Sequence, residues 1–285
     1  MKKYSLLLLS VALLAGCANS TSKQSSQKTQ TSSTVQLSKA DQKTLDNATA
    51  EYKDFVEMQI DQLLKDTEGF RDTLKAGNLE EAKKQYPLIR MAYERSEPIA
   101  ETFGESDVKI DYVDENKSEE GWSGFHRIEG ILWENNTTDG TDKYADQLVN
   151  DIKELKAKIA TVDVTPDVML TGAVDLLNEV ATQKITGEEE VFSHTDLYDF
   201  RANIEGAEKI FSLFKPLIEK KDAKLVKTLE AEFKNVNDLL DKHMTDETNY
   251  KSYTDLTKED TKELAEAVTK LGEPLSQMGV ILDGK

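Results

Sequence analysis

The chain has 285 residues, with 54 acidic and 36 basic side chains and a formal net charge of −18 at pH 7. So strong a negative charge argues against nucleic acid or an anionic membrane surface as a partner, and it favours solubility and an affinity for cations. The single cysteine excludes disulfides within the chain and metal sites built from thiolates. Any metal site must therefore use oxygen and nitrogen ligands.

The amino terminus has the pattern of a lipoprotein signal peptide. Lys2 and Lys3 form a positive segment, and residues 6–14 form an apolar core too short to span a membrane. The segment Leu-Ala-Gly-Cys that ends at Cys17 resembles the lipobox of bacterial lipoproteins, in which the cysteine is diacylated. Two acyl chains are enough for stable anchoring. We predict a signal peptide at 1–16 and a lipid anchor on Cys17 at the extracytoplasmic face of the cell membrane; an ordinary secretory signal is the alternative.

Residues 17–37 are predicted to be the lipidated cysteine and a disordered tether. They are rich in Ser, Thr, Gln, Asn and Lys and cannot bury enough apolar surface to offset the entropy lost on ordering. Removal of residues 1–16 deletes two lysines and no acid, so a charge of −18 becomes −20 in the mature chain. Residues 38–285 are predicted to form one helical domain, since no linker rich in glycine or proline divides them.

The first part of this domain is predicted to contain two long helices. Apolar residues recur at steps of three and four over 45–74, which predicts one amphipathic helix. A second helix is predicted over 78–104, with a capping-box spacing at its start and kinks at Pro87 and Pro98. The acidic stretch 105–120 has little apolar periodicity, and we predict a loop there.

The rest of the domain continues the helical pattern. Periodicity resumes near residue 122 and then predicts helices at 144–159, 165–180, 192–218, 225–240 and 264–271. The last of these is predicted to end before Gly272. With roughly eight helices, short connections and no strand, the fold class is all-α, and we expect bundle packing as two four-helix units that share one core.

His126 and Glu129 are the first candidate metal ligands. A step of three residues places the imidazole and the carboxylate on one face of a helix, as in metal sites built inside helical bundles. The alternative is a hydrogen-bonded pair on the surface. The helix is apolar on nearly all sides, with Trp122, Phe125 and Ile128 among its neighbours, which favours burial, and a buried charge needs a partner.

Other segments offer carboxylates to such a pair. Glu97 continues an apolar stripe of the second predicted helix, with Glu94 beside it; alternatively, Glu94 forms a surface pair with Arg90 and Glu97 is satisfied locally. Arg201 and Glu205 lie on one side of a later helix and are predicted to be a buried polar pair or to support the site, with Glu205 also a possible ligand. The other two histidines have simpler interpretations. His194 belongs to a helix cap, and His243 is predicted to be a surface residue at a helix end.

Three longer motifs carry a resemblance to a known family. They are Ala-Tyr-Glu-Arg-Ser-Glu-Pro-Ile-Ala at 92–100, Gly-Phe-His-Arg-Ile-Glu at 124–129 and Ser-His-Thr-Asp-Leu-Tyr-Asp-Phe-Arg-Ala-Asn-Ile-Glu-Gly-Ala at 193–207. Together, and in this order, they closely resemble the EfeM/EfeO lipoproteins of the imelysin-like superfamily, over essentially the whole mature domain. The resemblance implies a fold of two four-helix bundles.

The resemblance also implies a function and a site. It implies an iron-binding component of a high-affinity iron uptake system that works beside a membrane iron permease and a haem-type peroxidase. The family's metal motif falls on His126 and Glu129, with Glu94, Glu97, Asp142 and Glu205 as candidates for further ligands. Longer members carry an amino-terminal cupredoxin-like domain, and here a short tether takes that place, so this chain resembles the short EfeM form. Any oxidation or second metal site that the cupredoxin domain supplies would be missing.

The residues and the resemblance together predict binding rather than catalysis. A histidine with several carboxylates suits iron, as Fe²⁺ or Fe³⁺, and equally manganese or zinc; iron is preferred on the resemblance. A metallopeptidase is one alternative, although the usual zinc-protease helix, His-Glu-x-x-His, has a second histidine that this helix lacks. The others are a surface protein that binds polymers or adheres to other cells, and a structural lipoprotein without a ligand.

Overall fold

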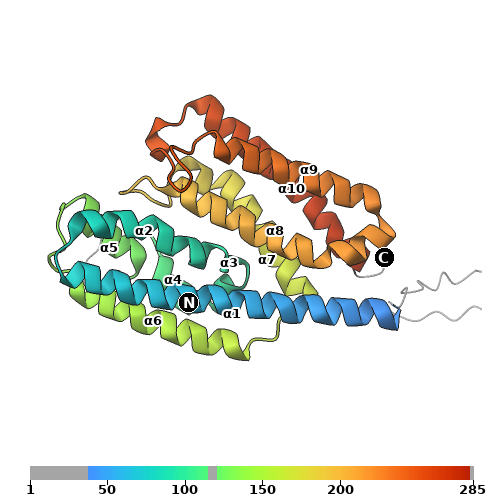
Figure 1. Cartoon of the computed structure of the whole chain (residues 1–285), viewed down its shortest axis with the longest axis horizontal. Helices are drawn as coiled ribbons and strands as arrows, with labels where there is room; N and C mark the ends of the chain where they lie inside the picture. Colours follow the sequence, from blue (N-terminus) through green and yellow to red (C-terminus); the bar gives the residue numbers. More distant parts are fainter. Residues whose placement is uncertain (1–37, 115–120, 283–285) are drawn as a thin grey trace, which may run out of the picture. The chain divides into compact units, whose positions relative to one another are not determined.

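A computed structural model describes residues 38–114 and 121–282, and in this part of the chain the fold is all-α, as predicted. The predicted signal peptide, Cys17 and the tether at 17–37 lie outside the described residues. Figure 1 shows the arrangement of the helices. Their bounds are α1 Lys39–Lys75, α2 Leu79–Glu94, α3 Glu97–Ala100, α4 Gly104–Asp111, α5 Phe125–Trp133, α6 Asp142–Thr161, α7 Pro166–Thr182, α8 Asp196–Lys221, α9 Ala223–Asp241 and α10 Lys258–Leu282, with short 3₁₀ helices η1 Glu101–Phe103, η2 Lys184–Thr186 and η3 Tyr253–Asp255.

The first two helices form where the apolar periodicity predicts them. The hydroxyl of Ser38 accepts a hydrogen bond from the backbone N–H of Asp41 and caps α1, which continues for 37 residues. Helix α2 continues through Pro87 to Glu94, and the chain turns at Arg95 and Ser96 before α3 begins at Glu97. Pro98 lies in the first turn of α3, where proline is tolerated because a backbone N–H there would have no partner within the helix. The turn places Glu94 and Glu97 on either side of a bend.

Helix α4 corrects the prediction of a loop beginning at residue 105. The sequence of this segment looks solvated because it contains Ser106, Asp107 and Lys109. In the structure, however, Ser106 and Ile110 are buried. The Ser106 hydroxyl accepts a hydrogen bond from the ammonium of Lys158 at 2.8 Å, and the Tyr93 hydroxyl donates to the Asp107 carboxylate at 2.5 Å. Contacts with α3, α5 and α6 therefore stabilise a helix that its own apolar pattern does not specify.

Two predictions at the carboxyl-terminal end are also wrong. Helix α10 does not end before Gly272 but continues through Gly272 and Pro274 to Leu282, and both residues are buried against neighbouring helices. His243 was expected on the surface, yet its side chain is buried and its pKa is lowered by that burial. In both places tertiary packing outweighs the local sequence signal.

Helix α8 contacts helices on both sides of it. It packs against α1 and α2 on one side and against α7, α9 and α10 on the other, while α1 also packs along α6 (Figure 1). The division into two separate four-helix units stays a prediction, because α8 belongs to both sets of contacts. None of the helices in the described part of the chain is long and apolar enough to cross a bilayer.

Candidate metal centre

Gly124 sets the position of His126 at the start of α5. Its φ of 87° lies in the left-handed region, and a Cβ atom there would lie 2.3 Å from the backbone oxygen of Ile110. Only glycine fits, because any side chain would collide with α4. The close approach places His126 in the first turn of α5, beside the end of α4.

His126 and Glu129 form a buried pair, so the alternative of a surface pair is wrong. Nδ1 of His126 lies 3.0 Å from Oε2 of Glu129, and both side chains are fully buried. The other carboxylate oxygen, Oε1, accepts hydrogen bonds from the backbone N–H groups of Phe192 and Ser193 at 3.0 and 2.7 Å. Glu129 is thus held in place on one oxygen and holds the imidazole with the other.

The imidazole of His126 has candidate ligand groups on both of its edges. Nε2 lies 3.5 Å from Oδ1 of Asp111 and 3.9 Å from Oε1 of Glu189, but it has no hydrogen-bond partner among the described residues. Asp111, His126 and Glu189 thus form one group of candidate ligands. His126, Glu129 and Glu190 form a second group on the Nδ1 edge. In each group one ligand atom per residue can be chosen so that all lie within 4.8 Å of one another.

Arg90 lies at the centre of the surrounding carboxylates. Its guanidinium is fully buried, contacts Asp111 and Glu190, and lies 2.6 Å from Oε1 of Glu94. Asp199 is 3.6 Å away. The pair between Arg90 and Glu94 is therefore buried, and the surface alternative is wrong here as well. Arg90 fixes three carboxylates around the imidazole.

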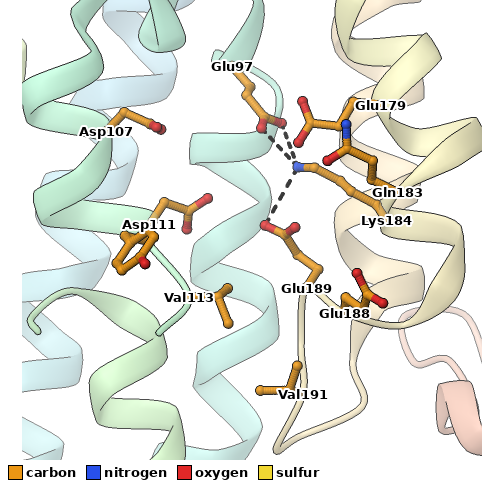
Figure 2. Close-up of a pocket in the computed structure, with 11 residues that line it drawn as sticks. Glu97, Asp107, Asp111, Val113, Glu179, Gln183, Lys184, Glu188, Glu189 and Val191 are labelled. Atoms are coloured by element: carbon orange, nitrogen blue, oxygen red, sulfur yellow. Dashed lines mark hydrogen bonds and ion pairs between the residues drawn. The ribbon is translucent and has the colours of Figure 1, made fainter. Parts of the chain in front are cut away.

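Lys184 occupies the other side of the cluster. Its ammonium donates hydrogen bonds to Oε1 and Oε2 of Glu97, at 2.8 and 3.1 Å, and to Oε2 of Glu94 at 3.2 Å. Glu189 lies 3.6 Å away. Figure 2 shows Lys184 extending between Glu97 and Glu189. The amide of Asn203 donates to the carboxylates of Glu94 and Glu97 at 2.9 and 2.7 Å.

Carboxyl groups outnumber cations in this cluster. Among the described residues, seven carboxyl groups lie within reach of Arg90, Lys184 or His126, and only the first two of these three are permanent cations. The seven are Glu94, Glu97, Asp111, Glu129, Glu189, Glu190 and Asp199. With all seven carboxyls ionised and His126 neutral, a formal excess of five negative charges would remain in the protein interior, which is strongly unfavourable without protons or another cation.

The pKa values show how the cluster carries this charge without a metal. Burial raises the pKa of Glu189 to about 7, partly opposed by Lys184, and burial together with the charge of Glu129 raises the pKa of Glu190 to about 7. Burial also holds the pKa of Asp199 well above its usual value. Arg90 has the opposite effect on Asp111, whose pKa it lowers against the effect of burial. Several carboxyls therefore keep protons that a metal cation can replace.

A cavity of about 650 Å³ adjoins the cluster. Asp111 and Glu189, which face Nε2 of His126, also line this cavity (Figure 2). Its other charged or polar lining residues are Glu97, Asp107, Tyr112, Glu179, Gln183, Lys184 and Glu188. An acidic wall concentrates cations beside Asp111 and Glu189, the two carboxylates that face Nε2.

Comparison with known proteins gives the family. A protein-family model described as imelysin matches residues 48–278. An "Efem/EfeO family lipoprotein" of Staphylococcus haemolyticus (strain JCSC1435) is 51% identical over 291 residues, which cover 99% of this chain and 100% of the relative. The chain belongs to the EfeM/EfeO lipoproteins of the imelysin family. A relative of the same name from Staphylococcus aureus (strain MSSA476) is 52% identical over 244 residues, covering 84% of this chain and 86% of its own.

The EfeM/EfeO motifs meet in this cluster. The structure brings His126, Glu129, Glu94 and Glu97 into one buried region, although Glu94 and Glu97 contact the cations Arg90 and Lys184. Asp142 is exposed at the start of α6, outside both candidate ligand groups.

Glu205 also lies outside both groups. Its carboxylate accepts a hydrogen bond from Arg95 at 2.6 Å at the partly exposed side of α8. Arg201, predicted to pair with it, instead contacts Asp241 and donates to the side chain of Asn237 at 2.6 Å. His194 precedes α8 in the left-handed conformation, with φ of 58°.

Sequence reasoning missed several members of this imelysin cluster. Asp111 and Glu189 lie in acidic stretches that look like solvated loops, and Arg90 and Lys184 look like ordinary surface cations. The sequence indicates Asp111 through its neighbour Ile110, an apolar residue in an acidic segment, which proves to be buried in the structure. No spacing rule joins Glu189 or Lys184 to His126, because they come together only when η2 and the following loop pack against α2 and α4.

Proposed function

We propose that this EfeM/EfeO chain is an extracytoplasmic, lipid-anchored protein that binds iron in the cluster around His126 and passes it to a membrane permease. The observation that carries the proposal is the buried Nε2 atom of His126, which lacks a hydrogen-bond partner among the described residues and faces two carboxylates on the wall of an acidic cavity. An unpaired buried nitrogen is unfavourable unless a ligand completes it.

The cation is proposed to sit on the Nε2 edge, with Asp111 and Glu189 as carboxylate ligands. Nδ1 already faces Glu129, and a histidine that binds a metal through one nitrogen commonly donates the other N–H to a carboxylate. Glu129, a ligand by the family resemblance, would in this arrangement orient the imidazole. Imidazole and carboxylate ligands suit iron and also manganese or zinc; the choice of iron rests on the family.

Binding would be coupled to protons. Burial and the charge of Arg90 lower the pKa of His126, but polar contacts with Asp111 and Glu129 outweigh them and keep this pKa well above its usual value. Ligation needs a neutral imidazole and ionised carboxyls, and a bound cation therefore releases protons. Acidification should weaken binding and favour release of the cation.

The remaining parts of the proposal rest on the sequence and the family. Cys17 would carry the lipid anchor, and an iron permease and a haem-type peroxidase would be the partners, with the acidic surface collecting cations in front of the membrane. Nucleic acid is not among the proposed partners. A peptidase role has less support, because α5 offers a single histidine where the zinc-protease helix has two.

Isothermal titration of the purified protein with Fe²⁺ under anaerobic conditions tests the proposal, with chelated Fe³⁺, Mn²⁺ and Zn²⁺ in parallel. We expect saturable binding of one iron per chain and its loss in a His126→Ala/Glu129→Ala variant. Asp142→Asn, at an exposed carboxylate outside both groups, is the matched control and should bind iron normally. A folded wild-type protein that binds none of these ions would overturn the proposal.

A further inference from the structure

Lys184 is an unusual residue to find beside a metal centre. It begins η2, its side chain is buried, and it is the one basic residue among the described residues that line the acidic cavity. Three carboxylates surround its ammonium: both oxygens of Glu97 at 2.8 and 3.1 Å, one oxygen of Glu94 at 3.2 Å and one oxygen of Glu189 at 3.6 Å. Figure 2 shows the contacts with Glu97 and Glu189. The ammonium thus has the oxygen neighbours of a bound ion.

The carboxylates around Lys184 are held in place by more than the ammonium. Glu94 and Glu97 flank the bend between α2 and α3, and the amide nitrogen of Asn203 donates to both. The amide oxygen of Asn203 is buried without a hydrogen-bond partner in the described part of the chain. Both oxygens of Glu97 and one oxygen of Glu94 thus converge on one point, and they form an oxygen set of the kind that hard divalent cations take.

Glu189 links this set to His126. One of its oxygens lies 3.6 Å from the ammonium of Lys184 and 3.9 Å from Nε2 of His126. A carboxylate shared by two cations is typical of helical-bundle proteins that bind two metal ions side by side. Here a lysine occupies the second of those places.

We propose that the ammonium of Lys184 occupies a second cation position in the cavity and so limits the centre to one metal ion. This inference rests on the proposed function, since it assumes a first ion at His126. The lysine supplies one positive charge from a tethered group, and its ammonium occupies oxygens of Glu94 and Glu97, which keeps both carboxylates from ligating. Lys184 is therefore a residue that determines how many ions this protein takes.

Removal of the ammonium should open the second position. We would load the purified wild-type protein and Lys184→Met with Mn²⁺, which avoids oxidation during handling, and count bound ions by titration calorimetry and by elemental analysis after gel filtration. The expected result is one Mn²⁺ per chain in the wild type and two in Lys184→Met. One ion in both proteins overturns the inference and leaves the proposed function standing, whereas no ion in either overturns both.

Three control variants assign the second ion to this position. Lys184→Met/Glu97→Gln removes a proposed ligand and should bind one ion, and Lys184→Arg keeps a cation and should also bind one. Lys220→Met removes an exposed lysine, paired with Asp41, and should bind one. If Lys184→Met fails to fold without metal, circular dichroism during Mn²⁺ addition decides: the inference expects helix to return, and absence of rescue contradicts it.

Discussion

Helix α8 passes through two buried regions of opposite character. Its first half buries Asp199 and Asn203 among the charges around Arg90, while its second half buries Phe211 and Phe214 in an apolar core shared with α9 and α10. Side chains from both halves are fully buried, since Asp199 is 1% exposed and Phe214 is 0% exposed. One helix therefore contributes buried side chains both to the polar cluster and to the apolar core.

The two regions contribute differently to the stability of the folded chain. Apolar burial stabilises the folded chain in proportion to the area removed from water, while burial of ionisable groups stabilises it only when every charge is paired. With seven carboxyls around two permanent cations, the polar region is incompletely paired. Such a region is expected at a binding site rather than in a core that exists for stability alone.

The largest effect expected of a single substitution is in the apolar core around the second half of α8. Phe233 of α9 is 1% exposed and stacks on Phe211 of α8 with ring centroids 5.5 Å apart. Phe233→Ala should lower the free energy of unfolding by about 4 kcal/mol through lost burial and a cavity. Urea denaturation measures the loss. Iron affinity should stay at the wild-type value in the folded fraction, and a weakened affinity would show that the two regions are not independent.

The polar region around Arg90 should make the stability of the protein depend on pH in the opposite sense from most proteins. Glu189 and Glu190, with ordinary values of 4.5, have pKa values of about 7 in the folded chain. Between these values the folded state holds protons that the unfolded state has lost, so stability falls as pH rises from about 4.5 to 7, by roughly 3 kcal/mol per carboxyl. His126, whose folded pKa is raised, adds a further loss above pH 6.5.

Urea denaturation with a chelator at several pH values measures this fall. A Glu189→Gln/Glu190→Gln variant should show a much flatter profile, because neither amide titrates. Saturation with iron should remove most of the loss, since the cation replaces the protons. Stability that rises from pH 4.5 to 7 in the metal-free wild type would contradict the charge state that we assign to the cluster.

A smaller effect separates the position of His126 from general stability. Gly124→Ala should cost roughly 2–3 kcal/mol, because it combines a left-handed φ with a collision against Ile110. Gly140 has a similar φ of 83° but open space around its Cβ position, so Gly140→Ala should cost only about 1 kcal/mol. Thermal denaturation compares the two. Iron affinity should fall in Gly124→Ala alone, since only that change displaces the start of α5.

The sequence predicts helices that have a clear apolar face better than helices that are held by contacts with their neighbours. Apolar residues at helical spacing specify α1, α7 and α9 without knowledge of their neighbours, because each helix needs an apolar face to be buried. The failures are at α4 and in the second half of α10, where contacts with other helices hold a helix that lacks its own signal.

The residues of the candidate site also divide into those that local helix geometry brings together and those that tertiary packing brings together. His126 and Glu129 are three residues apart on one helix, so local geometry brings them together before any tertiary structure is known. Asp111 and Glu189 reach the imidazole through tertiary packing, and in a chain with 54 acidic residues no single carboxylate stands out. For the same reason the candidates Asp142 and Glu205 could not be separated from the others, and the structure places both away from the imidazole.

The smallest expected effects decide between the two edges of the imidazole. If the ion sits on Nε2, Glu129→Gln removes an orienting carboxylate and should weaken iron binding about 10- to 100-fold. Glu189→Gln removes a proposed ligand and should weaken it more, while Asp142→Asn should change little. Titration calorimetry at pH 7 ranks the three variants. The reverse order for Glu129 and Glu189 would place the ion on the Nδ1 edge with Glu129 and Glu190, where the cavity gives no direct access and the polar region would have to open to admit iron.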